Sequence, residues 1–396
     1  MKKIMILGAG RGQVQLIKTA KKLGYHTIVA SINGNYPGFA FADEVCYVDI
    51  SKPDEVLKQA QSLKIDGIAT ACLDTGISAL GYVCEKMNLP GLNSHSAELS
   101  GNKLLMKEAF FRNNVSTAKY KVLKSEDDLR DVENEFEFPV IIKAVDLQGS
   151  RGINVVRDES NLLKCYEDTM SETHQDFCIV EEFIDGHKFS CQAFVVNRKI
   201  LFTQCYGDVT YFSKTGIPIG HYVPLCVNYE ILRQSKNEVE KAINVIGFDN
   251  CVVNVDLIEK NNKVYIIELT GRIGANCLPE LTSIYYGVDI YKMIVETAMG
   301  KDMTHYFDSH ASCKKIPCYA KMLYSEKSGT LKDIINNNDK NENIVEITYF
   351  VEHGDEIHKF ENSKDCTGQV IVKGNSLDEC ENFINEVSNR IEFVLE

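Results

Sequence analysis

Residues 251–274 (CVVNVDLIEKNNKVYIIELTGRIG) constrain the fold more than any other stretch, because they have the pattern of two strands joined by a tight turn. Apolar and polar residues alternate on both sides of a polar segment, which predicts a β-hairpin. A turn centred on Asn262 pairs residues on one face as follows: Asp256 opposite Glu268, Asn254 opposite Thr270 and Ile258 opposite Ile266. The other face is then apolar and consists of Val253, Val255, Leu257, Tyr265, Ile267 and Leu269.

The acids Asp256 and Glu268 indicate a magnesium site. Carboxylates directly opposite on neighbouring strands have Cβ atoms about 5 Å apart, and two unit charges near that distance repel by roughly 3–4 kcal/mol at an effective dielectric of 20. Mg²⁺ takes one or two protein carboxylates and completes its shell with water and phosphate oxygens. Arg272 falls on the same face and adds a cation. Two alternatives stay open: the acids form a solvated pair on an exposed sheet, or a two-residue turn sends them to opposite faces.

Composition excludes several classes of protein. With 396 residues, 44% hydrophobic and 25% charged, the chain is long enough for two or three domains with cores of their own. It has no apolar run of membrane-spanning length, and its first residues lead straight into a strand, so we expect a soluble, cytoplasmic protein. Fourteen cysteines without a C-x-x-C pair indicate reduced thiols. A net charge of −13 without a strongly basic stretch argues against nucleic acid as a partner.

Residues 1–100 alternate strands and helices, which predicts a doubly wound parallel α/β domain. The glycine turn at 8–12 (GAGRG) joins the first strand to a helix, a layout that binds phosphate or lets the helix pack close to the sheet. The strand at 27–31 ends without the acid that a nicotinamide dinucleotide would need. After the strand at 67–70, Asp74 faces a substrate or, in the plainer interpretation, Asp74 or Thr75 caps the next helix.

The region from residue 102 to residue 186 carries candidate phosphate and adenine contacts. Lys143 lies in an apolar strand, so it should pair with an anion or extend to the surface. The loop Gly149-Ser150-Arg151-Gly152 has the donors that bind a polyphosphate, although a plain hairpin turn would look the same. Glu181 or Glu182 ends an apolar strand and would accept a hydrogen bond from an adenine amino group, unless both are exposed loop acids.

In this order the motifs resemble those of the ATP-grasp family, in the branch of biotin carboxylase, carbamoyl phosphate synthetase halves, purine-pathway ligases and L-amino-acid ligases. The matching features are Lys103, Lys143 in FPVIIKA, the loop 149–152, VEEFIDG at 180–186 and the acidic hairpin ending in ELTGR. The resemblance covers residues 1–300 and implies a preATP-grasp α/β domain at 1–100 and an ATP-grasp domain at 101–300. A lid subdomain would occupy about 115–185, and a C-terminal α+β domain 301–396.

The resemblance also implies site roles. Lys103 and Lys143 would hold ATP phosphates under the loop Gly149, Ser150, Arg151 and Gly152, and Glu181, Glu182 and the backbone of Phe183 and Ile184 would bind adenine. Asp256, Glu268 and Thr270 would bind Mg²⁺ or Mn²⁺, and Arg272 would steady an acyl phosphate. The chain departs from the family pattern at Asp256, where Glu is commoner, at Thr270, where Asn is usual, and at Lys188, where many relatives have an acid.

The implied function is ATP-dependent ligation of a carboxylate to an amine, with amino acids or a small peptide as substrates. Substrate contacts are expected from Tyr211, Lys214 and His221 in a loop at 203–230, and from Glu280 before a helix at 282–299. Strands at 314–324, 346–350 and 368–373 and a closing helix at 376–392 form a cap that shapes the pocket or a homodimer surface. The alternatives are bicarbonate as the acid, a nicotinamide-dependent reductase, and a nucleotide-binding protein without turnover.

Overall fold

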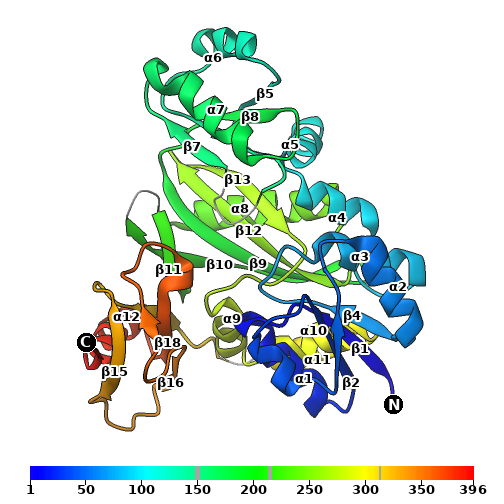
Figure 1. Ribbon diagram of the computed structural model, residues 1–396, viewed down its shortest axis with the longest axis vertical. Coiled ribbons are helices and arrows are strands. Elements are labelled where there is room, and N and C mark those ends of the chain that lie inside the picture. The colour runs from blue at the N-terminus through cyan, green and yellow to red at the C-terminus, as the bar shows by residue number, and fades with distance from the viewer. Residues whose placement is uncertain (148–151, 213–215, 312–313) are drawn as a thin grey trace. The chain divides into compact units, whose positions relative to one another are not determined.

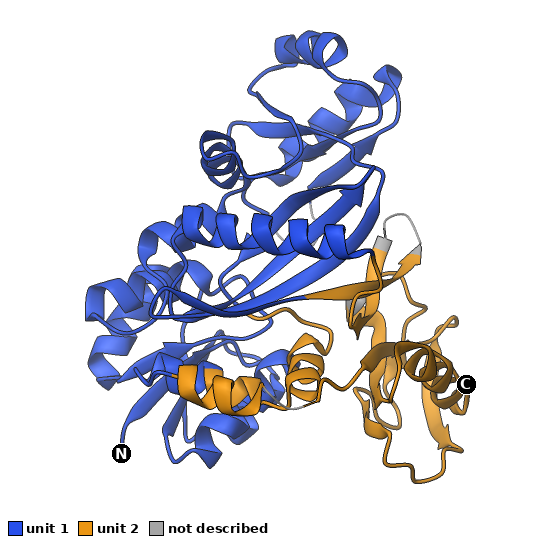
Figure 2. Cartoon of the chain, turned by 180° about the vertical axis from the view of Figure 1, so that it is seen from behind, with its two compact units in different colours: residues 1–204, 228–272, 294–302 blue, residues 205–227, 273–293, 303–396 orange. Residues whose placement is uncertain are grey.

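The computed structural model describes residues 1–147, 152–212, 216–311 and 314–396. The chain forms two compact units (Figure 2). Unit 1 consists of residues 1–204, 228–272 and 294–302, and unit 2 of residues 205–227, 273–293 and 303–396. Within the described residues, no helix is both long and apolar enough to cross a membrane.

Unit 1 begins with a four-stranded parallel sheet of order β3-β2-β1-β4 (Figure 1). Its strands are β1 (Lys3–Leu7), β2 (His26–Ser31), β3 (Glu44–Tyr47) and β4 (Gly67–Ala69), and its helices are α1 (Arg11–Lys22), α2 (Pro53–Leu63) and α3 (Ile77–Met87). The apolar strand residues, such as Ile4 to Leu7, are fully buried, which is why these strands read as continuous hydrophobic runs. The predicted parallel α/β arrangement is confirmed.

The glycine turn of this sheet is built for close packing. A Cβ on Gly12 would lie 2.8 Å from the Cβ of Cys72, which follows β4, so only glycine lets α1 approach that closely. Gln13 closes the turn from inside, since its Nε2 donates to the Ala71 carbonyl and its Oε1 accepts from the Gly10 N–H. These contacts favour the packing interpretation of the glycines over a nucleotide site.

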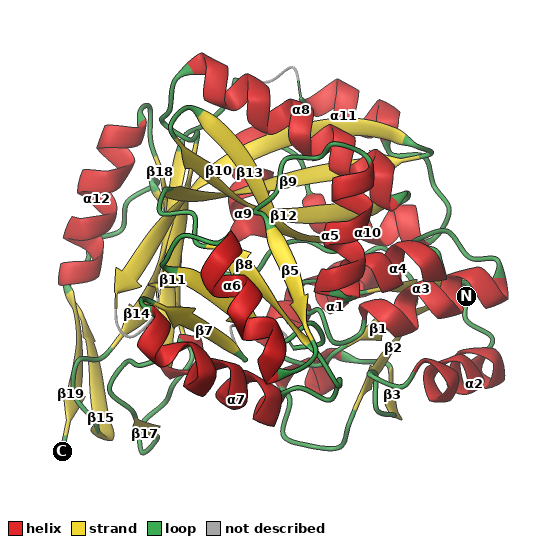
Figure 3. Cartoon of the chain, turned by 90° about the horizontal axis from the view of Figure 1, so that it is seen from above, coloured by secondary structure: helices red, strands yellow, loops and turns green. Residues whose placement is uncertain are grey.

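A second, antiparallel sheet of order β5-β8-β6-β7 follows helices α4 (Ser94–Gly101) and α5 (Lys103–Arg112). Its elements are β5 (Tyr120–Leu123), α6 (Leu129–Glu135), β6 (Val140–Lys143), β7 (Ile153–Val156), α7 (Leu162–Glu172) and β8 (Cys178–Glu182). Figure 3 shows α6 and α7 beside these strands, and Val132 and Tyr166 from the two helices join Ile142 and Val180 in one core.

The rest of unit 1 is an antiparallel sheet of order β13-β12-β9-β10 with one long helix. Its elements are β9 (His187–Val196), the first part of β10 (Lys199–Phe212), α8 (Tyr229–Ile246), β12 (Cys251–Lys260) and β13 (Lys263–Thr270). The amphipathic α8 buries Ile231, Val239 and Ile243, and its C-cap Gly247 has a φ of 79°.

Unit 2 continues β10 into the strand order β10-β11-β14-β18-β16 and adds a small sheet of order β17-β15-β19. The strands are β11 (Gly216–Val223), β14 (Cys318–Tyr324), β15 (Gly329–Asn336), β16 (Ile344–Tyr349), β17 (Glu356–Ile357), β18 (Cys366–Lys373) and β19 (Ile391–Leu395). The helices are α9 (Leu278–Tyr286), α10 (Ile290–Ala298, which ends in unit 1), α11 (Thr304–His310) and α12 (Leu377–Asn389).

Three expectations for this region are wrong. The loop expected at 203–230 is largely the hairpin of β10 and β11, because the stretch is rich in the β-branched and aromatic residues that favour strands. The single helix expected at 282–299 is two helices, since Gly287 ends α9 in a left-handed conformation with φ of 70°. The closing helix ends at Asn389, and the next residues form β19 beside β15.

Candidate active site

The hairpin of β12 and β13 brings the two predicted metal acids face to face. The register pairs Asp256 with Glu268 and Asn254 with Thr270, as predicted. The turn itself, however, has only two residues, Asn261 and Asn262, with φ of 54° and 61°. Such a turn alone would put the acids on opposite faces.

A β-bulge restores the pairing. The register shifts between Asp256 and Leu257, because Leu257 pairs with Ile266 while Asp256 pairs with Glu268, so Ile267 is an extra residue on β13. Two expected details are therefore wrong. Ile258 pairs with Tyr265 and not with Ile266. Tyr265 and Ile267 do not share the apolar face of Leu257 but pack beside Ile258 in a separate cluster.

The surroundings of the acids suit a hard divalent cation. Asp256 is half-buried and Glu268 is exposed, and Asn254 donates from Nδ2 to Asp256 Oδ1 at 3.3 Å. Gln192 in turn donates to Asn254 Oδ1 at 2.6 Å, which orients that amide. The described residues contain no cluster of three or more His, Cys, Asp or Glu side chains fit to hold a metal. Two carboxylates fit Mg²⁺, which completes its shell with water and phosphate, better than a metal that needs a full protein cage.

Arg272 is held by an acid from the first sheet. Its Nε donates to Asp74 Oδ1 at 2.7 Å and its Nη2 to Asp74 Oδ2 at 2.6 Å. Thr270 donates its hydroxyl to the same Oδ1 at 3.0 Å. Burial lowers the pKa of Arg272, but the Asp74 carboxylate outweighs it and leaves the pKa above its usual value. Asp74 thus fixes two predicted site residues at once.

This role of Asp74 corrects the helix-cap interpretation. Helix α3 begins after Gly76, and no side chain caps it. In the sequence, the signal for a site role of Asp74 is its position after β4, at the carboxyl end of a parallel sheet. The partner, Arg272, lies 198 residues away in the chain, so no local pattern identifies the pair.

Lys143 has the anion that its apolar strand required. Its Nζ lies 3.0 Å from Glu181 Oε2, and Lys107 Nζ lies 3.0 Å from the same oxygen. The side chains of Lys107 and Glu181 are 2% exposed and that of Lys143 is 8% exposed. Burial raises the pKa of Glu181, but the two lysines outweigh this effect and hold it below its usual value. Glu181 is therefore a buried counter-ion, and Lys107 is a residue of this network that the sequence did not reveal.

Lys103 contacts the chain just before the predicted phosphate loop, and Gly152 is the last residue of that loop. Lys103 donates from Nζ to the Leu147 carbonyl at 2.5 Å, and the Ala144 N–H donates to the Gly152 carbonyl at 2.8 Å. Both contacts lie beside the end of β6, where Lys143 stands. Gly149, Ser150 and Arg151 lie outside the described residues.

The predicted adenine contacts follow one another at the end of β8. Glu182 is exposed, and its N–H donates to the Lys119 carbonyl at 2.9 Å. Phe183 comes next, and Ile184 is buried against Ala118 and Ile258. Glu181, by contrast, pairs with the two buried lysines Lys107 and Lys143.

The predicted substrate contacts other than Arg272 belong to unit 2. His221 is 5% exposed and its Nδ1 lies 2.9 Å from Asp208 Oδ1 across the β10–β11 ladder. Tyr211 packs against the Phe360 ring at 5.0 Å between centroids. Glu280 accepts from Tyr291 Oη at 2.6 Å, and burial raises its pKa. Lys214 lies outside the described residues.

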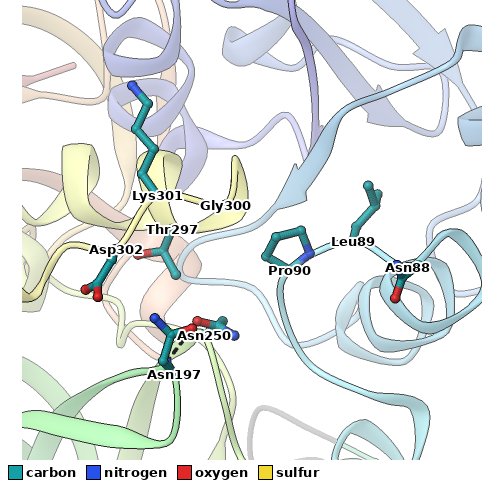
Figure 4. A pocket seen from close by; sticks show the side chains of 9 residues that line it. All are labelled: Asn88, Leu89, Pro90, Asn197, Asn250, Thr297, Gly300, Lys301 and Asp302. Carbon is teal, nitrogen blue, oxygen red and sulfur yellow. Dashed lines mark hydrogen bonds between the residues drawn. The ribbon is translucent and has the colours of Figure 1, made fainter.

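A separate pocket of about 300 Å³ lies in unit 1 (Figure 4). Its lining is polar and includes Asn88, Asn197, Asn250 and Thr297, and the Asn197 N–H donates to Asn250 Oδ1. The Lys301 side chain points away from it in Figure 4, and its Nζ pairs with Glu296. None of the predicted site residues lines this pocket.

Two domain families match the chain. Residues 101–274 match the family described as phosphoribosylglycinamide synthetase, ATP-grasp (A) domain, and residues 321–396 match L-amino acid ligase C-terminal domain 2. The first match includes α5 with Lys103, β6 with Lys143 and the β12–β13 hairpin. The second covers the C-terminal part of unit 2.

Solved structures match along the whole chain. A phosphoribosylglycinamide synthetase from Anaerococcus prevotii is 48% identical, with a TM-score of 0.88 and complete coverage of both chains. An L-amino acid ligase from Bacillus licheniformis is 18% identical, with a TM-score of 0.83, 100% coverage of this chain and 99% of that one. The biotin carboxylase domain of 2-oxoglutarate carboxylase from Hydrogenobacter thermophilus, solved with MgADP and bicarbonate, is 18% identical, with a TM-score of 0.79 and coverage of 100% and 91%. The chain therefore has the ATP-grasp fold and belongs to the ATP-grasp family of ATP-dependent carboxylate–amine ligases.

Proposed function

We propose that this protein activates the carboxylate of an amino acid with MgATP and joins it to an amine. The observation that carries the proposal is the convergence of Asp256, Glu268, Thr270 and Arg272 on one end of the β12–β13 hairpin. The L-amino acid ligase match at residues 321–396 supports an amino-acid substrate. So does the name of the 48% identical relative, since phosphoribosylglycinamide is an amide of glycine.

In the proposed reaction, a carboxylate oxygen attacks the γ-phosphorus of ATP and ADP leaves. The amine nitrogen then attacks the acyl carbon, phosphate leaves, and the nitrogen loses a proton. Lys103 and Lys143 bind the phosphates, and Arg272, fixed by Asp74, stabilises negative charge on the acyl phosphate. Asp256 and Glu268 would hold Mg²⁺, which supplies charge neutralisation at the phosphates, with Thr270 beside them.

The remaining roles follow the same order along the chain. Glu182, Phe183 and Ile184 contact the adenine, and residues 149–152 cover the phosphates. Tyr211, Lys214, His221 and Glu280 contact the carboxylate or amine substrate. We assign the preATP-grasp domain to residues 1–100, the ATP-grasp domain to 101–300 with its lid at about 115–185, and the C-terminal domain to 301–396.

The test is ADP release by the purified chain with ATP, Mg²⁺ and mixed amino acids, with the amide product identified by mass spectrometry. Stimulation of ADP release by the amino acids in the wild type, but not in the double variant Asp256→Asn/Glu268→Gln, would support the proposal. Stimulation by bicarbonate alone would instead support a carboxylase, which the bicarbonate-bound relative makes the second candidate. ATP binding without ADP release under either condition would refute both.

A further inference from the structure

Lys107 is a buried cation to which no role has been assigned. It lies on α5, one turn after Lys103, and its side chain is 2% exposed. Lysine is seldom buried so completely unless it is paired. Its Nζ lies 3.0 Å from Glu181 Oε2 and donates to Thr117 Oγ1 at 2.8 Å.

Thr117 fixes Lys107 to the hairpin. Its hydroxyl donates to the Ile266 carbonyl at 2.9 Å, so the oxygen lone pair is free to accept from Lys107. The Ile266 N–H donates to the Ser116 carbonyl at 2.8 Å. Residues 116 and 117 are thus bonded to β13 next to the bulge. This leaves the Lys107 ammonium little freedom to reach a ligand itself.

The two lysines share a single oxygen of Glu181. Burial lowers the pKa of Lys107, and the Glu181 carboxylate opposes this effect. With both lysines protonated, two cations face one anion and the group keeps one positive charge. Without Lys107, Glu181 would neutralise Lys143 completely. The triphosphate of ATP would then face a Lys143–Glu181 pair with no net charge. The electrostatic attraction between Lys143 and the phosphates would be lost.

We propose that Lys107 is a positioning residue that satisfies Glu181 so that the charge of Lys143 remains available to the phosphates of ATP. The inference rests on the proposed function, in which Lys143 contacts those phosphates. Lys107 acts through Glu181 and Lys143 and does not touch the nucleotide.

The test measures MgATP affinity of the full chain by calorimetry, with adenosine as a probe without phosphate. Lys107→Met is expected to weaken MgATP binding by about 10-fold or more, the scale of one lost charge-assisted hydrogen bond, and to leave adenosine binding unchanged. Lys107→Met/Glu181→Gln is expected to return MgATP affinity to near the wild-type value, because Lys143 then has no competing carboxylate. The matched variant Lys143→Met/Glu181→Gln has the same total charge and is expected to stay weak.

The outcomes separate this inference from the proposed function. If Lys107→Met binds MgATP normally, or if Lys107→Met/Glu181→Gln folds but stays weak, the inference is overturned. Should Lys107→Met fail to fold, the comparison of the two double variants decides, since equal affinities would also overturn it. If Lys143→Met/Glu181→Gln binds MgATP as wild type does, the phosphate role of Lys143, and with it the proposed site, is wrong.

Discussion

Asp74→Asn is expected to destabilise unit 1 because it removes the counter-charge of Arg272. The Asp74 carboxylate accepts hydrogen bonds from two nitrogens of the Arg272 guanidinium, and the Arg272 side chain is 12% exposed. Removal of one partner from a fully buried pair costs about 3–5 kcal/mol. Asp74 is 27% exposed, so water recovers part of that cost, and asparagine keeps one carbonyl acceptor. We therefore expect a loss of about 2 kcal/mol in the free energy of unfolding at pH 7.

Urea unfolding of the full chain measures the stability, and ADP release under saturating ATP measures the effect on Arg272. If all of the loss reaches the transition state, kcat falls by about 30-fold, while the KM for ATP stays near the wild-type value. Glu230→Gln is the matched control, because Arg233 grips Glu230 with the same two-pronged geometry at 2.9 and 2.8 Å. Both side chains of that pair are about half exposed, so Glu230→Gln should change neither the unfolding free energy nor kcat measurably. Equal effects of the two substitutions, or a fully stable Asp74→Asn, would refute the reasoning.

Three further predictions concern single carboxylates. Glu268→Gln is expected to raise the Mg²⁺ concentration for half-maximal ADP release by about 10-fold, and an unchanged magnesium requirement would contradict the metal assignment. Burial raises the pKa of Glu280, so ionisation of Glu280 at a pH above its unfolded pKa of 4.5 costs stability. Glu280→Gln should therefore raise the melting temperature at pH 8 but not at pH 4. A lower melting temperature of Glu280→Gln at pH 8 would refute this. A hydrogen bond from Lys21, with a second from the Thr27 backbone, lowers the pKa of Asp43 from 3.8 to about 2. Asp43→Asn should therefore be less stable than wild type at pH 7, and the difference in unfolding free energy should vanish as pH falls from about 4 towards 2. A difference that stays constant with pH would argue against this.

The sequence predicted the parallel sheet and the acid pair because both depend on local periodicity. The buried runs around Ile4 and Ile28 are short and apolar, which is typical of core strands in a parallel sheet. The pairing of Asp256 with Glu268 came from assuming an odd turn, whereas the structure reaches it with an even turn and a bulge at Ile267. The prediction of the acid pair is confirmed, but the route to it was wrong, since a bulge leaves no periodic signature.

The remaining features depend on contacts between residues far apart in the chain. Asp74 pairs with Arg272, and Lys107 with Glu181, across long separations in the chain. The apolar stretch with Lys143 predicted that an anion must exist, but not that a second lysine would share it. Gly287 could have been recognised as a helix end, because glycine is the residue most often found in the left-handed conformation that ends a helix.

The bulge at Ile267 has a consequence for how this hairpin tolerates changes in length. Eleven residues, 257–267, separate the two acids, an odd number that a regular ladder with a two-residue turn cannot accommodate. Loss or gain of one residue leaves an even number, which closes on the same two carboxylates with no bulge at all. A homologue one residue shorter or longer here can therefore keep its two carboxylates side by side, and a one-residue gap between the acids in an alignment is no sign that their pairing is lost.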